Sequence, residues 1–315
     1  MFGSTTEMLV RRSLLVLALV ALAVAAMVGA GFAGGSGHAA GKSAPNNARL
    51  VVYCATSVHD SGLMQDVVLP AYNTAHPGIT VNPTYVGSGE AIQAARDGLA
   101  DVIIVCSPPD EKQLLTDGVA TLRLPFAYNY FTIVGPKGDP AKVARARSAA
   151  DAFKRIAAYG ARLAAGKVAF VSRGDASGTN KKELQLWYAA DVTTSAATAP
   201  TGAWYITAAG GQLPCLQVSA GKGAYTLTDT ATWLKNQSTL APLVKTLTKK
   251  EDLKNEYSVL LLNQIMHDQV ASTGAEWLAA WLVSYEGQRA IGAYGRSTYG
   301  QPLFVPNAST ISAQL

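Results

Sequence analysis

The sequence is poor in the residues that build metal centres and nucleic-acid surfaces. It includes only four histidines, which are scattered, and three cysteines, which form no Cys-x-x-Cys pair. A metal site is therefore not expected. It contains no block of lysines and arginines, and its net charge is only +5. Nucleic acid is a poor candidate for a partner, because binding to phosphate backbones needs a concentrated basic surface.

Charge is also absent from a long run near the start of the chain. Residues 13–37 carry no charged side chain, are rich in Leu, Val and Ala, and follow Arg11 and Arg12. This pattern predicts an export signal over residues 1–40, with cleavage near His38 and a periplasmic location for the mature chain. The alternative is a retained membrane anchor, since the apolar run is about long enough to span a bilayer.

The remaining chain is rich in apolar runs of the length of buried strands. Residues 49–106 contain "RLVVYC" and "DVIIVC", separated by segments with helical spacing, and "KVAFVS" follows downstream. Continuous apolar strands between helices indicate a parallel sheet that is covered on both faces. The predicted fold class is α/β, with two lobes that each contain a mainly parallel sheet flanked by helices.

Two strand-like segments are predicted to connect the lobes. "FTIVG" crosses to the second lobe and "YSVLL" crosses back, which assigns residues 46–131 plus 255–315 to lobe I and residues 132–254 to lobe II. A terminal helix is expected to pack on lobe I. Its apolar face is formed by Trp277, Leu278, Trp281, Leu282 and Tyr285.

The cysteines allow a disulfide if the chain is exported. Cys54 and Cys106 each end an apolar run, so they lie at matching heights if the two runs are neighbouring parallel strands. We predict a Cys54–Cys106 bridge and a free Cys215. The alternative is three unpaired thiols.

One loop, "SRGDASGTNKKE" from Ser172 to Glu183, gathers an unusual number of hydrogen-bond donors between a strand and a helix. Asn180 or Thr179 is expected to cap the helix, which leaves Arg173, Ser177 and the first helical amides for another purpose. Amides at a helix N-terminus favour anions. The loop therefore predicts an oxyanion site, and the alternative is a capped surface turn in which Arg173 pairs with Asp175.

The first lobe offers similar groups at the ends of its strands. "ATS" at residues 55–57 ends one strand, and "GSG" at residues 87–89 joins a strand to a helix. Ligands of such sheets bind at the carboxyl ends of the strands. If the donor groups of the two lobes face each other across a cleft, they replace the hydration shell of a bound dianion. One Arg then supplies the only full positive charge that the site needs.

These segments resemble the tungstate-binding periplasmic proteins of ABC transporters, which are relatives of molybdate and sulfate binders. The similar pieces extend over about residues 50–290, and "SRGD-x-SGT" followed by Lys-Lys-Glu is the most specific of them. The chain departs from the family pattern at five positions. These are Cys54 and Ala55 in place of threonines, Cys106 and Asn180 in place of histidines, and Thr230 in place of an arginine.

The resemblance implies a type II periplasmic-binding-protein-like fold and a set of ligand-binding residues. The ligand is tungstate or molybdate, there is no other cofactor and no catalysis, and the partners are the permease and ATPase subunits of an ABC transporter. The implied ligand-binding residues are Thr56, Ser57, Ser88, Arg173, Ser177, Gly178 and Thr179. Tyr225 and Thr228 are second-tier candidates, for which core packing and turn capping are the alternative roles.

Other functions remain open from the sequence. A phosphate- or sulfate-binding protein has the same architecture, but protonated phosphate needs an acceptor, for which Asp60 and Asp175 are the candidates. A serine hydrolase is the alternative from a different class, with His59 and Asp60 as base and orienting group. It is disfavoured because no Gly-x-Ser-x-Gly elbow is present.

Overall fold

The computed structural model describes residues 48–208, 210–247, 252–267 and 272–308. The predicted export signal, its cleavage site and the alternative membrane anchor lie outside these residues. Within the described part of the chain, no helix is long and apolar enough to cross a membrane.

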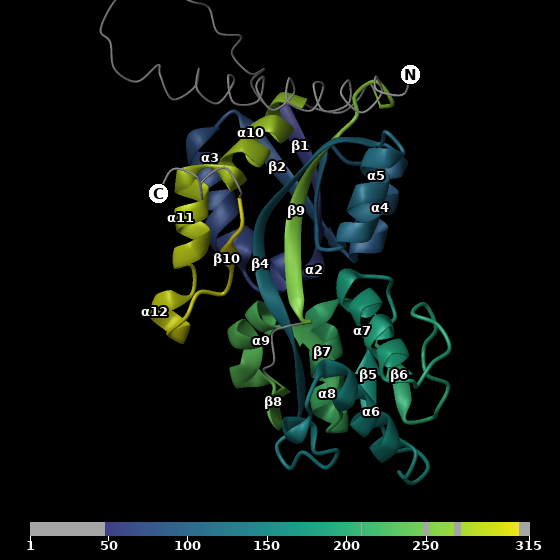
Figure 1. Cartoon of the computed structure of the whole chain (residues 1–315). Helices are drawn as coiled ribbons and strands as arrows, with labels where there is room; N and C mark the ends of the chain where they lie inside the picture. The colour runs from purple at the N-terminus through teal and green to yellow at the C-terminus, as the bar shows by residue number, and fades with distance from the viewer. Residues whose placement is uncertain (1–47, 209, 248–251, 268–271, 309–315) are drawn as a thin grey trace, which may run out of the picture. The chain divides into compact units, whose positions relative to one another are not determined.

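The first lobe is built on a sheet with the strand order β10-β4-β9-β3-β1-β2 (Figure 1). The strands β1, β2 and β3 run parallel to one another, whereas β9 is antiparallel to both β3 and β4. The strand bounds are β1 Ala48–Ala55, β2 Ile79–Val86, β3 Val102–Val105, β4 Ala120–Pro136, β9 Lys254–Leu262 and β10 Val305–Pro306.

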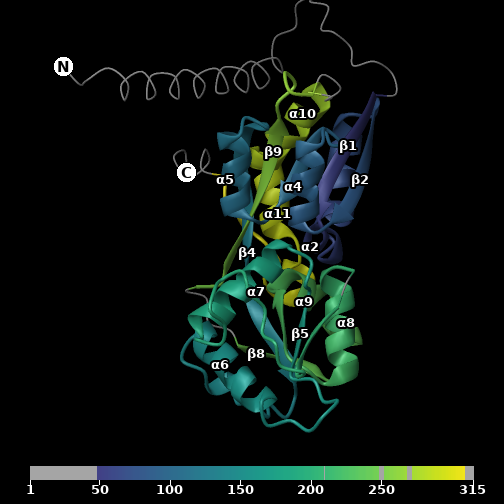
Figure 2. The same cartoon turned by 90° about the vertical axis from the view of Figure 1, so that its right-hand side faces the viewer.

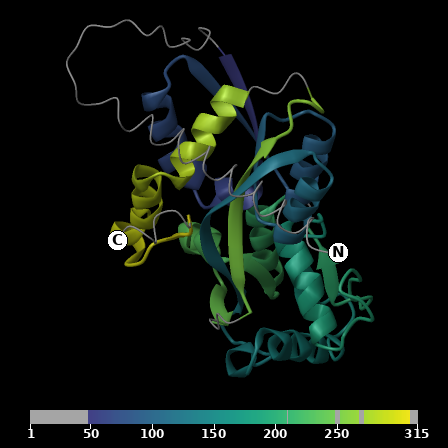
Figure 3. The ribbon, with the colours of Figure 1, turned by 45° about the horizontal axis from the view of Figure 1, so that its top comes forward.

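Helices cover both faces of this sheet, as continuous apolar strands require. Ile104 and Val259 face the cluster that includes α10, whereas Ile103 and Leu260 face the cluster under α4 and α5. Figures 1 and 3 show these two helix layers on opposite sides of β9. The helix bounds are α2 Thr56–Asp60, the π-helix η2 Met64–Val68, α3 Leu69–Ala75, α4 Ser88–Arg96, α5 Pro108–Thr116, α10 Ser272–Val283, α11 Tyr285–Ala293 and α12 Arg296–Tyr299.

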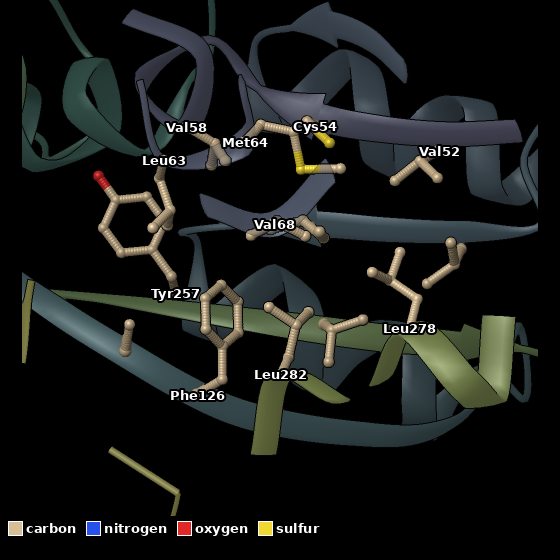
Figure 4. Packing of buried hydrophobic residues seen from close by; sticks show 14 of the residues in the cluster. Val52, Cys54, Val58, Leu63, Met64, Val68, Phe126, Tyr257, Leu278 and Leu282 are labelled. Atoms are coloured by element: carbon tan, nitrogen blue, oxygen red, sulfur yellow. The ribbon is translucent and has the colours of Figure 1, made fainter. Parts of the chain in front are cut away.

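The core of lobe I lies between the sheet and the α10 layer. Figure 4 shows Leu278 and Leu282 of α10 packed towards Phe126 and Tyr257, with Val68 and Met64 beside them. These side chains are almost fully shielded from solvent. Burying a side chain of this size contributes roughly 1.5–3 kcal/mol.

The second lobe combines a parallel pair with antiparallel strands. The parallel pair is β5 with β6, and β7 and β8 each pair antiparallel with the second half of β4. Figure 2 shows α8 on one side of β5, with α6 and α7 on the other. The bounds are β5 Phe170–Ser172, β6 Tyr205–Thr207, β7 Thr226–Asp229, β8 Leu243–Leu247, α6 Ala149–Gly160, α7 Gly178–Ala189, α8 Gln212–Lys222, α9 Thr230–Asn236, and the 3-10 helices η3 Val143–Arg145 and η4 Gln237–Thr239.

The predicted two-lobed α/β fold is confirmed, with more antiparallel pairing than expected. Two long strands, β4 and β9, run side by side through the middle of the molecule and pair at Asn129 with Asn255 and at Tyr130 with Lys254. Beyond Tyr130, β4 pairs only with strands of the second lobe. The two strands run in opposite directions and pair antiparallel in the first lobe, and the second half of β4 adds antiparallel pairs with β7 and β8 in the second lobe.

The terminal helix differs from the prediction. It is interrupted at Ser284, whose hydroxyl oxygen accepts a hydrogen bond from the Gly287 amide at 3.1 Å and so caps a new helix, α11. The side chain of Tyr285 is 62% exposed and does not join the buried face of α10. Serine is a strong N-cap residue, and its local hydrogen bond outweighs the continuing apolar period.

The predicted Cys54–Cys106 disulfide is wrong, because all three cysteines are free and buried. In the parallel pair of β1 and β3, Cys54 lies opposite Ile104, so Cys106 is two residues further along. That offset is about 6.6 Å along the strands. Together with the spacing between strands, it separates the Cα atoms by more than the roughly 7 Å that a disulfide spans.

Candidate ligand-binding site between the lobes

Arg173 lies at the centre of the candidate site, directly after β5. Only 3% of its surface is exposed. Its Nη2 donates to the Thr56 hydroxyl of lobe I at 3.0 Å, and its Nη1 donates to the Gln212 side chain of lobe II at 3.3 Å. The guanidinium therefore joins the two lobes at the ends of β1 and β5.

Asp175 is the acidic partner of this arginine. Its Oδ2 accepts from Arg173 Nη2 at 2.6 Å, and its Oδ1 accepts from the Ser177 amide at 3.1 Å. Burial opposes ionisation of Asp175, but the Arg173 charge and these hydrogen bonds outweigh it and lower the pKa of the carboxyl. Asp175 is thus a carboxylate that fixes the orientation of the Arg173 fork.

The helix that follows, α7, is capped by Ser177. The Ser177 hydroxyl accepts from the Asn180 amide at 3.2 Å, so the prediction that Asn180 or Thr179 is the cap is wrong. Asn180 instead braces the loop, because its Oδ1 accepts from the Ala176 amide and its Nδ2 donates to the Ser172 hydroxyl. Ser177 is buried, and Gly178 and Thr179 form the first turn, whose amides have no carbonyl partner within the helix.

Glu183 of α7 holds the loop between β5 and α7 through hydrogen bonds. It accepts hydrogen bonds from the Ser172 hydroxyl at 2.6 Å, from the Trp187 indole at 2.9 Å and from the Tyr205 hydroxyl at 2.9 Å. Burial raises the pKa of Glu183 to about 7, although these donors act in the opposite direction. The Ser172 oxygen in turn accepts from the Gly174 amide at 3.1 Å, so Glu183 acts on the loop through Ser172.

The corner between β2 and α4 meets this loop from the first lobe. Ser88 is fully buried, and its hydroxyl oxygen accepts from the Cys106 amide at 3.4 Å. A Cβ on Gly89 would lie 2.9 Å from the Ala176 carbonyl oxygen, and one on Gly178 would lie 2.1 Å from the Cys106 carbonyl oxygen. Glycine at these two positions therefore allows the backbones of the two lobes to approach closely.

Ser57 completes the lobe I side. It is buried at the start of α2, and its hydroxyl oxygen accepts from the Tyr257 hydroxyl of β9 at 3.1 Å. Thr56, Ser57, Ser88, Arg173 and Ser177 thus come from corners that lie close together across the lobe boundary.

The two second-tier candidates lie in different surroundings. Tyr225 belongs to the core of lobe II, where its hydroxyl donates to Asp139 at 2.7 Å and accepts from the Ala141 amide. Thr228 is fully buried near the end of β7, and its hydroxyl contacts only the carbonyl oxygen of Asp229 among the hydrogen bonds described. The apolar surroundings of Tyr225 correspond to the core role that the sequence left open.

Three other polar residues at the site were not singled out from the sequence. Gln212 begins α8 and holds Arg173. Asp229 caps α9 by accepting from the amides of Ala231 and Thr232, and burial raises the pKa of its carboxyl. Tyr257 holds Ser57. Gln212 and Tyr257 belong to no motif, whereas Asp229 followed by a helix is a recognisable capping signal.

The histidine of the hydrolase alternative lies beside its aspartate. His59 Nδ1 is 3.0 Å from Asp60 Oδ1, and Asp60 Oδ2 accepts from the Leu213 amide of lobe II at 3.0 Å. The Ser177 hydroxyl is used in capping and has no hydrogen bond to His59 among the described residues. The described part of the chain contains no cluster of three or more metal-binding side chains.

A groove with a volume of about 630 Å³ opens beside the site, between α5, α7 and β9. It is bordered by Lys181, Lys182 and Lys254, with Asp110 and Glu256 among the acidic residues. Lys181 Nζ of lobe II contacts Asp110 Oδ2 of lobe I at 2.5 Å. This ion pair crosses the lobe boundary at the edge of the site.

Comparisons with known proteins agree on one family. A model described as a PBP superfamily domain matches residues 39–286. The tungstate-binding protein TupA of Peptoclostridium acidaminophilum is 35% identical over 262 residues, which cover 82% of this chain and 86% of that protein.

Two solved structures extend the comparison. The crystal structure of the tungstate ABC transporter from Geobacter sulfurreducens is 34% identical with a TM-score of 0.67, and the match covers 78% of this chain and 98% of that one. The tungstate binding protein TupA from Desulfovibrio alaskensis G20 is 32% identical with a TM-score of 0.64, and the match covers 83% of this chain and 99% of that one.

Proposed function

This chain belongs to the PBP superfamily, in the family that includes the tungstate-binding protein TupA, and we propose that it captures a tetrahedral oxyanion, tungstate or molybdate, for an ABC transporter. We further propose that it works in the periplasm without catalysis and hands the anion to the permease. The relatives support this role, because they are named as a tungstate-binding protein, a putative ABC transporter anion-binding protein and a tungstate ABC transporter.

The observation that carries the proposal is the state of four buried or half-buried hydroxyls. Thr56, Ser57, Ser88 and Ser177 each accept a hydrogen bond from the protein, the donors being Arg173, Tyr257 and the amides of Cys106 and Asn180. A hydroxyl has one hydrogen, and an oxygen that already accepts keeps that hydrogen for another partner. Ser88 also lies 3.6 Å from Cys106 Sγ, and the Ser177 side chain also bonds to the Asp175 carboxylate. Thr56 and Ser57 have no second partner among the described hydrogen bonds, so their hydrogens are the ones that face a fully ionised oxyanion as donors.

We propose that the ligand-binding set is Thr56, Ser57, Ser88, Arg173, Ser177, Gly178 and Thr179. Arg173 supplies the full positive charge, and the hydroxyls and first-turn amides supply the neutral donors. The N-termini of α4 and α7 favour negative charge at this position. A hydrogen bond to a charged group contributes roughly 1.5–3 kcal/mol, so several together offset the desolvation of a dianion.

The acceptors that phosphate needs are already engaged. Both carboxylate oxygens of Asp175 accept from Arg173 and Ser177, and those of Asp60 contact His59 and the Leu213 amide. Near neutral pH phosphate keeps a proton, whereas tungstate and molybdate do not. This arrangement supports selection against phosphate, because its proton would face donors.

We propose that the lobes close on the anion by a hinge motion about β4 and β9. The proposed division is residues 46–131 plus 255–315 for lobe I and residues 132–254 for lobe II. Two adjacent strands at the boundary suit a hinge, because small changes in a few backbone dihedrals rotate whole lobes.

Calorimetric titration tests this function with tungstate, molybdate, sulfate and phosphate in turn. We expect binding of the first two, no comparable binding of phosphate, and weakening by about 2–5 kcal/mol in Arg173→Ala, the range for removing one partner of a buried charge pair. Arg155→Ala removes an arginine of the same lobe whose ion pair lies within α6, and it is expected to bind normally. Absence of tungstate and molybdate binding, or preferential phosphate binding, contradicts the proposal.

A further inference from the structure

A chain of buried hydrogen bonds runs through the two crossing strands to Ser57. Asn129 Nδ2 donates to Asp229 Oδ1 at 2.8 Å, and Asn255 Nδ2 donates to Asn129 Oδ1 at 2.9 Å. The same Asn255 nitrogen donates to the Tyr257 hydroxyl at 2.9 Å, and Tyr257 donates to the Ser57 hydroxyl at 3.1 Å. All five side chains are at most 2% exposed.

In this row of buried hydrogen bonds, each side chain fixes the direction of the hydrogen bond that the next one makes. The Asp229 carboxylate, which already serves as an acceptor for two amides, orients the Asn129 side chain with its nitrogen towards it. The Asn129 oxygen then faces Asn255 and requires a nitrogen there. The Asn255 nitrogen gives its hydrogens to Asn129 and Tyr257, so the Tyr257 hydrogen is directed to Ser57.

Ser57 differs from the other hydroxyls of the site in the kind of donor that it receives. Thr56, Ser88 and Ser177 accept from N–H groups, which cannot accept in return, although Ser88 also contacts the Cys106 thiol at 3.6 Å. Ser57 accepts from a hydroxyl, which on its own is able to donate or to accept. The direction of the Ser57 hydrogen bond is therefore the one that the rest of the chain must fix.

We propose that Tyr257, held by Asn255, Asn129 and Asp229, is a positioning residue that makes Ser57 donate its hydrogen into the cleft and so contributes to selection against protonated oxyanions. This inference rests on the proposed function, because it assigns a specificity role within the same anion site. Without Tyr257, the Ser57 hydroxyl is free to rotate and to accept the proton of a hydrogen phosphate ion.

Two further observations support a functional role for this row of buried hydrogen bonds. Among the described residues, the buried Asn255 Oδ1 has no hydrogen-bond partner, as is also true of Asp229 Oδ2, and for Asn255 this is unfavourable unless the amide is retained for its nitrogen. Burial, aided by the negative charge of Asp229, raises the pKa of Tyr257 well above its ordinary value, so the phenol keeps its hydrogen.

The position of Tyr257 also suits this role. Figure 4 shows its ring among Leu63 and Phe126 with the hydroxyl pointing out of the apolar cluster. The ring is thus fixed by packing, and Tyr257→Phe removes the hydroxyl alone without opening a cavity.

Tyr72 provides a matched control for the test. It is a second fully buried tyrosine of lobe I, and its hydroxyl donates to the Gly274 carbonyl oxygen at 3.0 Å, outside the candidate site. Tyr72→Phe removes one buried hydrogen bond, whereas Tyr257→Phe removes two, one to Ser57 and one from Asn255, so both are expected to lower the thermal midpoint, Tyr257→Phe by the larger amount. Only Tyr257→Phe is expected to change anion selectivity.

The experiment is titration of wild type, Tyr257→Phe, Tyr72→Phe, Ser57→Ala and the Ser57→Ala/Tyr257→Phe double variant with tungstate and with phosphate. We expect Tyr257→Phe to weaken tungstate binding about tenfold and to lower the tungstate-to-phosphate affinity ratio by at least that factor. In the Ser57→Ala background, Tyr257→Phe is expected to change neither affinity by more than about twofold.

The possible results separate this inference from the proposed function. A wild-type protein that binds neither anion overturns both. A wild-type protein that binds tungstate, together with a Tyr257→Phe variant of unchanged affinity ratio, overturns only the role of Tyr257. An equal loss in Tyr72→Phe, or a full additional loss in the double variant, also overturns it, because the effect then does not act through Ser57.

Discussion

At the scale of single residues, Glu183 shows how a buried charge shapes the loop after β5. Three donors point at its carboxylate, one of them the Ser172 hydroxyl that organises the loop. Burial still raises the pKa of Glu183 to about 7 from an ordinary value of 4.5. The folded protein therefore holds the proton more tightly than the unfolded chain, so the stability linked to this group is present below pH 4.5 and is lost as the pH rises to about 7.

The raised pKa of Glu183 predicts that the free energy of unfolding depends measurably on pH. Lowering the pH from 7.5 to 5 is expected to raise the free energy of unfolding of the wild type by about 2 kcal/mol relative to Glu183→Gln, which lacks the titrating group. Denaturant unfolding at the two pH values measures this difference. The control is Glu286→Gln, at an exposed position of α11, which is expected to follow the wild type. Parallel pH dependence of the wild type and Glu183→Gln would falsify the assignment.

Residues that follow one another in the chain were the ones that the sequence identified. Arg173, Ser177 and Gly178 share one loop, and the chemistry of that loop indicates an anion site directly. Tyr257 and Ser57 are 200 residues apart, and Arg173 and Gln212 are 39 apart. Only the path of the chain through both lobes brings these pairs together, so no local pattern contains them.

At the scale of elements, the start of α7 is placed by its close approach to the end of β3. The Cα of Gly178 packs against the backbone of Cys106, which belongs to the other lobe. This contact brings the first-turn amides of α7 to the corner that contains Ser88. The position of the helix N-terminus therefore depends on the absence of a side chain at residue 178.

Gly178→Ala tests this contact. The added Cβ would lie 2.1 Å from the Cys106 carbonyl oxygen, so the lobes cannot approach as closely, and we expect tungstate affinity to fall at least tenfold. Gly221→Ala in α8 is the control, because no atom of the described residues lies within 4 Å of its added Cβ, and alanine favours a helix by up to about 1 kcal/mol. Calorimetry gives the affinities. Normal binding by Gly178→Ala means that the contact is not needed for capture.

Elements were predicted well where apolar runs are uninterrupted. The buried strand β3 follows from its continuous apolar run alone. The break at Ser284 and the offset between Cys54 and Cys106 were missed. The first depends on one local hydrogen bond, and the second depends on strand register, which apolar runs specify poorly when both faces are buried.

At the scale of the whole molecule, the lobes are also joined away from the anion corners. The Lys181–Asp110 pair connects α7 to α5 across the groove, with both side chains about one third exposed. Pairs of this exposure contribute roughly 0.2–1 kcal/mol. That is too little to hold the lobes together alone, but it is enough to alter how fast they separate.

We therefore expect Lys181→Met and Asp110→Asn each to raise the dissociation rate of tungstate by about two- to fivefold. The agreement of the two variants is the critical result, because they change the charge near the anion in opposite directions. Lys154→Met removes an exposed pair within lobe II and serves as the control. Stopped-flow displacement measures the rates. Opposite effects of the two variants would show that general electrostatics, rather than the pair, controls release.

The place of β9 in the sheet has a consequence for how this molecule assembles. β9 lies between β3 and β4, yet it is synthesised after the whole of lobe II. Until residue 262 has left the ribosome, the facing edges of β3 and β4 have no neighbour, whereas every strand of lobe II is already available. Lobe II is thus able to fold first. Lobe I remains incomplete until almost the entire polypeptide exists.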